Sequence, residues 1–119
     1  MRISTIIPAY NAESTLKECL KSVVGQSVRP FEVILVDDGS TDNTRSVAAK
    51  FESKLTLRIV SQANSGLGKA RNAGMAAATG DAYAFLDADD VWLPGKLEQG
   101  VKGLLKYPKN QWFYTPKLE

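Results

Sequence analysis

Two groups of aspartates directly follow short apolar segments of the sequence. They are Asp37 with Asp38, and Asp87 with Asp89 and Asp90. Adjacent carboxylates repel one another, so such groups need a cation or hydrogen-bond donors to stabilise them. Carboxylate oxygens are the ligands that hard divalent cations such as Mg prefer. The two groups therefore predict a polar ligand and make the chain a candidate for binding a nucleotide together with a metal ion.

Composition narrows the chemistry further. The 119 residues suit one domain, and a hydrophobic content of 44% with 24% charged residues is ordinary for a globular protein. There is no histidine, so imidazole-based zinc sites and histidine bases are excluded, and Mg or Mn is the expected metal. The single cysteine, Cys19, lies at an apolar position of a predicted helix, so we expect a buried core thiol without a disulfide.

Charge and hydropathy indicate which partners and compartment to expect. The net charge is +2, and the basic residues are scattered along the sequence rather than clustered, so we expect no nucleic-acid partner. The first residues lack a signal-peptide pattern, and no run approaches the roughly 18 apolar residues of a membrane span. We therefore expect a cytoplasmic protein, with membrane association left open for a longer form of it.

Two other side chains, Tyr10 and Arg71, could contribute to a binding site. Tyr10 follows a short strand and could stack on a nucleobase or simply cover the sheet edge. Arg71 lies near the start of a predicted helix, where anions bind, although a surface ion pair is the alternative. Of the first aspartate pair, Asp38 is the better candidate for a ligand contact because Gly39 lets the chain turn away. Both aspartates could instead cap the next helix.

The elements that must position these residues alternate regularly. Strands are expected at residues 3–8, 32–36, 55–60 and 82–86, and helices after Asn11, near 43–51, at 66–78 and from Pro94 onward. Asn11 and Ser40 or Thr41 are the expected caps of the first two helices. The order βαβαβαβα predicts a doubly wound, mainly parallel, Rossmann-like α/β sheet. Segment 112–114 is an open candidate for a further strand. Ligands of such sheets bind at the carboxyl ends of the strands.

Four ordered segments now reveal a resemblance to a known family. They are Ser4–Asn11 (STIIPAYN), Val36–Asp42 (VDDGSTD), Asn64–Gly74 (NSGLGKARNAG) and Phe85–Asp90 (FLDADD). From residue 3 to about residue 105 the chain resembles the N-terminal, nucleotide-sugar-binding half of a family 2 glycosyltransferase with the GT-A fold. The Gly66-x-Gly68-Lys69 piece is not a phosphate loop of the Walker type, because the first glycine and the hydroxyl residue after the lysine are missing.

The resemblance implies roles for individual residues. Pro8 and Tyr10 would flank the nucleobase, usually uracil in this family, and Asp38 would accept a hydrogen bond from it. Arg71 would contact the base or the diphosphate. The implied ligand is a nucleoside diphosphate sugar, with a UDP-sugar expected.

The second acidic group would hold the other end of the nucleotide. The resemblance implies that Asp87 approaches the ribose and that Asp89 holds Mg or Mn on the diphosphate, with the roles of Asp89 and Asp90 exchangeable. The implied reaction is inverting transfer of a sugar to an acceptor hydroxyl of a glycan, lipid or protein. The general base that this needs is expected beyond residue 119, so we expect the chain to bind donor without turnover.

The resemblance also implies a division of the chain. Residues 1–117 would be the donor-binding portion without the acceptor half, and Leu118 with Glu119 would be either a tag junction or a natural ending. Apolar surface left by the missing half would make a homodimer plausible. A nucleotidyltransferase-like protein and a non-catalytic nucleotide-binding module remain alternatives. A haloacid-dehalogenase-type phosphohydrolase fits less well, since its Asp-x-Asp motif ends the first strand.

Overall fold

Parallel strands form the centre of the protein. The computed structural model describes residues 1–106 and 112–114. Its strands are β1 (Ile3–Ala9), β2 (Glu32–Asp37), β3 (Leu57–Ser61), β4 (Ala82–Phe85) and β5 (Trp112–Tyr114). They form one sheet in the order β3-β2-β1-β4-β5, in which every neighbouring pair is parallel. The predicted parallel α/β sheet is confirmed, and segment 112–114 adds a fifth strand to the four expected.

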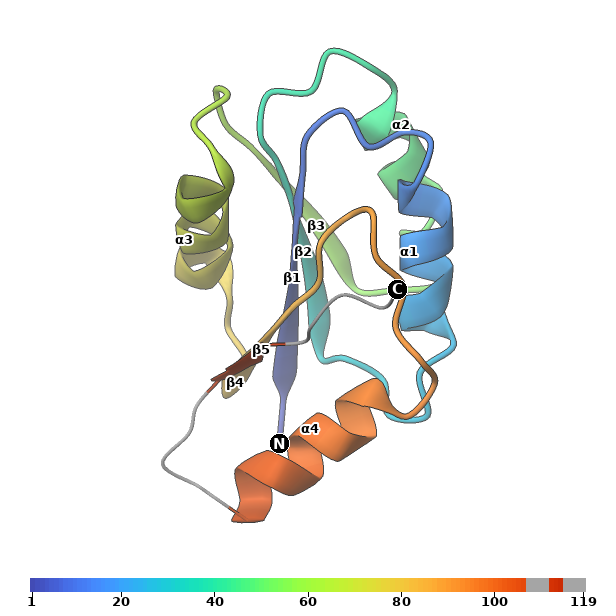
Figure 1. Cartoon of the computed structure of the whole chain (residues 1–119), viewed down its shortest axis with the longest axis vertical. Coiled ribbons are helices and arrows are strands. Elements are labelled where there is room, and N and C mark those ends of the chain that lie inside the picture. Colours follow the sequence, from blue (N-terminus) through green and yellow to red (C-terminus); the bar gives the residue numbers. More distant parts are fainter. Residues whose placement is uncertain (107–111, 115–119) are drawn as a thin grey trace.

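Helices cover both faces of this sheet, as a doubly wound fold requires. They are α1 (Leu16–Val24), α2 (Thr44–Ala49), α3 (Leu67–Ala77) and α4 (Lys96–Lys106). Figure 1 shows α1 and α2 on one face, α3 on the other, and α4 beyond the amino ends of the strands. In the described part of the chain, no helix has the length and apolar character needed to span a membrane.

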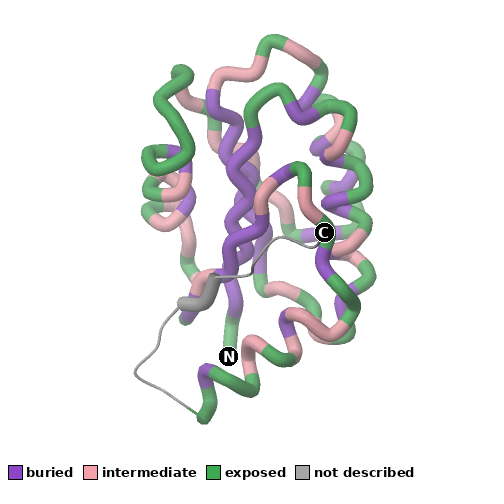
Figure 2. Tube along the Cα trace, viewed as in Figure 1, coloured by how far each residue is buried: buried purple, intermediate pink, exposed green. Residues whose placement is uncertain are grey.

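The core is split by the sheet into two unequal layers. Every residue of β1 and β2 is buried, which explains their continuous apolar sequences (Figure 2). The larger layer packs β1 and β2 against α1 and contains the Cys19 thiol, so the expected buried cysteine is confirmed. The smaller layer lies under α3, where a Cβ on Gly74 would come within 2.4 Å of the Ile6 side chain. Gly74 thus lets α3 lie directly on the sheet.

The two predicted helix caps are wrong in detail. Helix α1 begins at Leu16 and not directly after Asn11, because Asn11 has a φ of 47° and turns the chain first. The Asn11 side chain accepts a hydrogen bond from the Thr41 N–H instead of capping α1. Helix α2 begins at Thr44, whose N–H is bonded by the Asp42 carboxylate rather than by Ser40 or Thr41. The Asn11 and Ser40 side chains instead form hydrogen bonds from one loop to the other.

A buried carboxylate fastens the amino edge of the sheet. Glu32, at the start of β2, accepts hydrogen bonds from the Ser4 hydroxyl at 2.7 Å, the Thr79 N–H at 2.6 Å and Arg58 at 3.1 Å. Burial alone would raise the pKa of Glu32. The Thr79 and Ser4 hydrogen bonds and the Arg58 charge outweigh burial and hold that pKa below its ordinary value. Glu32 therefore joins β1, β2, β3 and the segment that leads into β4.

Candidate functional site

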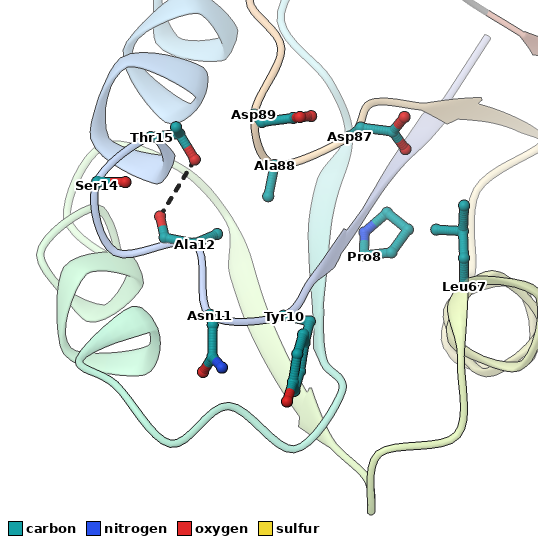
Figure 3. A pocket seen from close by; sticks show the side chains of 10 residues that line it. All are labelled: Pro8, Tyr10, Asn11, Ala12, Ser14, Thr15, Leu67, Asp87, Ala88 and Asp89. Carbon is teal, nitrogen blue, oxygen red and sulfur yellow. Dashed lines mark hydrogen bonds between the residues drawn. The ribbon is translucent and has the colours of Figure 1, made fainter.

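Two adjoining hollows open at the carboxyl edge of the sheet and share Pro8, Tyr10 and Leu67. The first, of about 400 Å³, is also lined by Asn11, Ala12, Ser14, Thr15, Asp87, Ala88 and Asp89 (Figure 3). The second, of about 370 Å³, is also lined by Ala9, Asp38, Asn64, Gly66 and Ala70. Residues as far apart in the sequence as Pro8 and Asp89 thus meet at one edge of the sheet, where the parallel strands end.

The Tyr10 ring stands at the boundary between the hollows. It follows β1 and is 53% exposed, although it is a large aromatic side chain at the mouth of a concave surface. Leu67, the first residue of α3, lies across from it and is 50% exposed. Two such side chains without a covering partner give the hollows apolar walls on which a flat ring could stack.

The turn that carries Tyr10 is held by the loop after β2. Three consecutive backbone N–H groups donate to side chains of that loop and of the first residue of α2: Asn11 to Ser40 at 2.9 Å, Ala12 to Thr44 at 2.9 Å and Glu13 to Asp42 at 3.2 Å. The Thr41 N–H returns a bond to the Asn11 side chain at 2.8 Å. These four hydrogen bonds connect the turn to a different segment of the chain and so fix the position of Tyr10.

The Asp38 carboxylate is buried and organises the second hollow. Its Oδ1 accepts from the Gln62 side chain and the Ser65 N–H, both at 2.8 Å, and its Oδ2 accepts from the Gly66 N–H at 3.0 Å. The Gln62 and Ser65 hydrogen bonds, with that of Gly66, outweigh burial and hold the pKa of Asp38 below its ordinary value. Asp38 is thus a firmly ionised acceptor whose Oδ2 keeps room for one further donor.

Asp37 has a structural role within its own loop. It is 3% exposed, and its Oδ1 accepts the Ser40 N–H at 3.0 Å. Arg45 approaches its Oδ2 at 3.9 Å. Gly39 makes the turn that directly follows the two aspartates. Its φ is +78°, and a Cβ there would lie 2.7 Å from the Asn64 backbone nitrogen.

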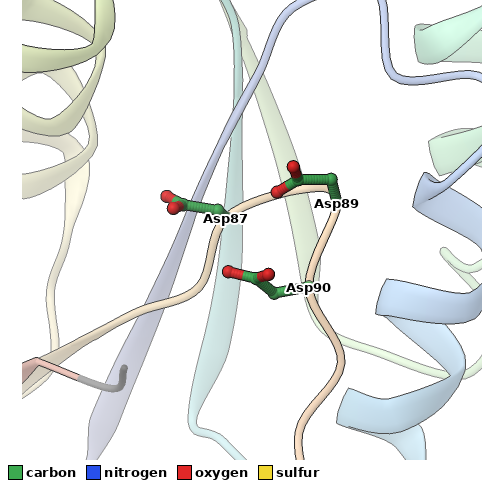
Figure 4. Close-up of side chains that lie close together, drawn as sticks. All are labelled: Asp87, Asp89 and Asp90. Carbon is green, nitrogen blue, oxygen red and sulfur yellow. The ribbon is translucent and has the colours of Figure 1, made fainter. Parts of the chain in front are cut away.

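The second acidic group gathers its carboxylates at one point. Oxygens of Asp87, Asp89 and Asp90 lie within 4.8 Å of one another, and Figure 4 shows the three side chains leaving the same turn after β4. Asp89 is exposed, and Asp87 lines the first hollow with it. Three hard oxygen donors at this separation match the chemistry of a Mg or Mn site.

The acidic turn is fastened to helix α1 from behind. The Cys19 thiol donates to the Asp87 carbonyl at 3.6 Å, and the Trp92 N–H donates to the Ser22 hydroxyl at 3.0 Å. Burial, reinforced by the neighbouring aspartates, raises the pKa of the Cys19 thiol. The thiol therefore stays protonated and acts as a donor beneath the turn rather than as a metal ligand.

Arg71 joins α3 to the acidic turn. Its guanidinium lies 3.5 Å from the Asp87 carboxylate and 6.0 Å from the centre of the Phe85 ring. It lines neither hollow, so the structure places it beside the site with its charge directed at Asp87. Arg71 therefore forms an ion pair, and its partner Asp87 is a carboxylate of the candidate site.

The structure brings the expected residues together and adds others. Pro8, Tyr10, Asp38, Asp87 and Asp89 all line the two hollows. Asn64, Gly66 and Leu67 line the second hollow, and only their membership of the third quoted segment indicated them beforehand. The Gln62 side chain that bonds Asp38 gave no signal in the sequence, because a lone glutamine after a strand is unremarkable.

Comparison with protein families gives one match that spans the chain. The sequence model described as glycosyl transferase family 2 matches residues 4–115. An uncharacterised glycosyltransferase of Nostoc is 48% identical over 104 residues, which are 86% of this chain and 32% of that protein. A UDP-Glc:α-D-GlcNAc-diphosphoundecaprenol β-1,3-glucosyltransferase of Escherichia coli is 36% identical over 87% of this chain and 41% of its own length.

Solved structures show the same arrangement. Staphylococcus aureus TarS in complex with UDP-GlcNAc superposes with a TM-score of 0.85 at 35% identity, covering 91% of this chain and 32% of that one. A mannosyltransferase of Pyrobaculum calidifontis, in complex with GDP-Man and Mn²⁺, gives 0.80 at 32% identity, covering 87% of this chain and 32% of the other. The chain thus spans 32–41% of the length of these four proteins.

Proposed function

Because the chain belongs to glycosyl transferase family 2, we propose that it forms the donor-binding part of an inverting, metal-dependent glycosyltransferase. The donor is a nucleoside diphosphate sugar, with UDP as the expected nucleotide. The observation that carries this proposal is the meeting of an apolar, aromatic-walled hollow with three clustered carboxylates at one edge of the sheet. Similar chains are known with UDP-GlcNAc and with GDP-Man and Mn²⁺.

In this proposal the nucleotide lies across both hollows. The base occupies the second hollow between Pro8 and Tyr10, where the free acceptor position of Asp38 takes an N–H of the base. The ribose and diphosphate extend past Leu67 into the first hollow, beside Asp87 and Asp89. An N–H donor on the base suits Asp38, because its low pKa keeps it an acceptor throughout the neutral range.

The acidic turn fits a divalent cation. Asp87, Asp89 and Asp90 supply oxygen donors alone, and a cation would relieve the mutual repulsion of their carboxylates. We propose Asp89 as the principal ligand because it is exposed at the hollow. A bound cation supplies positive charge that stabilises a departing diphosphate. Arg71 forms an ion pair with Asp87 and orients it. The positive charge of Arg71 also adds to the electrostatic potential near the proposed diphosphate position.

The remaining steps of the reaction need groups outside this chain. An inverting transfer requires a general base near the acceptor hydroxyl, and the two hollows offer no further carboxylate beyond those assigned to base and metal. We propose that residues 1–117 bind donor, and that the base, the acceptor site and any homodimer contacts belong to the whole enzyme. A cytoplasmic location is part of the same proposal.

Metal-dependent binding of UDP tests the donor site. Titration calorimetry of the chain with UDP should show binding in the presence of Mn²⁺ that weakens strongly when EDTA replaces the metal. Asp89→Ala should weaken Mn²⁺-dependent binding on the order of 10- to 100-fold, the range seen when groups that support a metal are lost. Asp81→Ala, which removes an exposed carboxylate at the amino edge, is the matched control and should bind normally. Equal binding by the Asp89 variant would refute the metal assignment.

Sugar transfer tests the division of the enzyme. Incubation of the chain with a UDP-sugar and simple acceptors should release no UDP above the rate without acceptor, because the proposed base is elsewhere. Transfer to any acceptor hydroxyl would show that the base lies within residues 1–119 and would contradict this part of the proposal.

A further inference from the structure

A third hollow lies away from the strand ends, on the outer surface between α1 and α2. It measures about 290 Å³ and is lined by Glu13, Lys17, Lys21, Val47, Lys50, Phe51 and Lys54. We call it the lysine hollow. Two of its lysines are four residues apart on α1, and the other two are four residues apart at the end of α2 and in the turn after it. Helical spacing directs Lys17 and Lys21 to one side of α1, and Lys50 and Lys54 line the same hollow from the turn after α2.

The lysine hollow gathers four of the 15 basic side chains of the protein. Four lysines stand against one lining glutamate, so the lining carries more positive charge than the whole chain, whose net charge is +2. Lys21 is 3.7 Å from Glu18. Within residues 1–106 and 112–114, no ion pair is recorded for Lys17, Lys50 or Lys54. The Lys54 ammonium instead lies 6.0 Å from the centre of the Phe51 ring. Most of the charge is therefore available to a partner.

The form of the lysine hollow indicates what kind of anion it suits. All four lysines and Glu13 are exposed, while the buried lining side chain, Phe51, is apolar. A selective site for one small anion would need buried, fixed donors, and the lining offers none. Mobile ammonium groups spread over two helices suit a broad anionic surface, because each Lys or Arg near such a surface adds about 1 kcal/mol of attraction.

We propose that the surface around the lysine hollow docks the protein on an anionic lipid membrane. The hollow adjoins the candidate donor site: Glu13 lines the lysine hollow, whereas its neighbours Ser14 and Thr15 line the first hollow at the strand ends. The turn before α1 therefore separates the two. A membrane held by Lys17 and Lys50 would lie beside the opening of the first hollow. Docking itself needs neither nucleotide nor metal, so it can be tested independently of the proposed function.

Vesicle sedimentation tests the proposal. The chain should sediment with phosphatidylcholine vesicles that contain phosphatidylglycerol and stay in solution with pure phosphatidylcholine, and added salt should release it. The triple variant Lys17→Gln/Lys50→Gln/Lys54→Gln should weaken binding to the anionic vesicles roughly 100-fold, as expected for three charges of this strength. Lys21 is retained because it pairs with Glu18.

A matched control separates local from total charge. Lys96→Gln/Lys102→Gln/Lys106→Gln removes three lysines from α4 and should bind anionic vesicles within about twofold of the original chain. Both variants should unfold at the original temperature and bind UDP with Mn²⁺ alike. Equal weakening by the two triple variants, equal sedimentation with neutral vesicles, or release by millimolar inorganic phosphate at constant ionic strength would each overturn the docking surface.

Discussion

The two edges of the sheet use carboxylates in opposite ways. At the amino edge, Glu32 is 4% exposed and is surrounded by donors from Ser4, Thr79 and Arg58. At the carboxyl edge, Asp89 is exposed at a hollow, in a cluster with two other carboxylates. The first arrangement surrounds one carboxylate with hydrogen-bond donors, whereas the second places three carboxylates close together. The difference separates a carboxylate that holds the fold from a cluster whose chemistry suits a cation.

Asp38 shows that position alone does not decide this. It lies at the carboxyl edge, yet it is 5% exposed and accepts three hydrogen bonds from the segment after β3. It therefore resembles Glu32 in its surroundings and Asp89 in its location. Such a residue can shape the second hollow and also offer one remaining acceptor position to a ligand.

The largest expected effect comes from removing the amino-edge carboxylate. Glu32→Ala should lower the free energy of unfolding by about 3 kcal/mol, because it leaves the buried Ser4 hydroxyl and Thr79 N–H without their acceptor. Asp89→Ala should change it by less than about 0.5 kcal/mol, as exposed substitutions do. Urea unfolding monitored by circular dichroism measures both. Similar losses in the two variants would remove the distinction between the edges.

A smaller effect should follow from disturbing the turn behind Asp38. Gly39→Ala puts a side chain on a backbone with φ +78° and brings a Cβ to 2.7 Å from the Asn64 nitrogen. The expected cost is about 1–3 kcal/mol of stability, as for other residues held in strained backbone conformations. UDP binding should weaken as well, because Asn64 lines the second hollow. Gly103→Ala in α4, where a Cβ meets nothing within 4 Å, is the control. It should leave UDP binding unchanged and raise the free energy of unfolding by about 0.5–1 kcal/mol, the usual gain of alanine over glycine inside a helix.

The smallest expected effect concerns pH. Because the pKa of Glu32 is lower in the folded protein than its ordinary value of 4.5, its stabilising contribution is complete above that value and is lost as pH falls through the folded pKa. Unfolding free energies measured from pH 7 downward should therefore decline in acid. Glu32→Gln should flatten part of that decline, with the rest due to Asp38, Asp42 and Asp81, whose pKa values are also low. An unchanged slope would show that Glu32 is not held as described.

The sequence was sufficient to predict the fold. Continuous apolar runs such as 33–36 indicate buried parallel strands, and the structure places them at the centre of the sheet. Helix starts were less predictable, since Asn11 and Ser40 are good capping residues in isolation but bond across two loops in the structure. Local rules assign such side chains to their own segment, and only the folded chain shows which segment lies opposite.

The residues of the site could be predicted from the sequence, but their arrangement could not. Asp38, Asp87 and Asp89 were expected because each follows a strand end, and all three line the hollows. That Asp38 is buried under Gln62 and Ser65 depends on how the segment after β3 folds back, for which the sequence has no periodic signal. The lysine hollow could not be predicted from the sequence for a related reason. Its four lysines are scattered in the sequence and gather only when α1 and α2 pack together.

The buried thiol of Cys19 gives the protein an internal reporter. It lies against the Asp87 carbonyl, and the chain has no other cysteine. A thiol reagent can reach it only when the turn after β4 or helix α1 opens, so the labelling rate counts those openings. An ion or nucleotide that binds the acidic turn and keeps it closed should slow that rate. Occupancy of the carboxyl edge could thus be followed chemically, without attaching a probe to the edge itself.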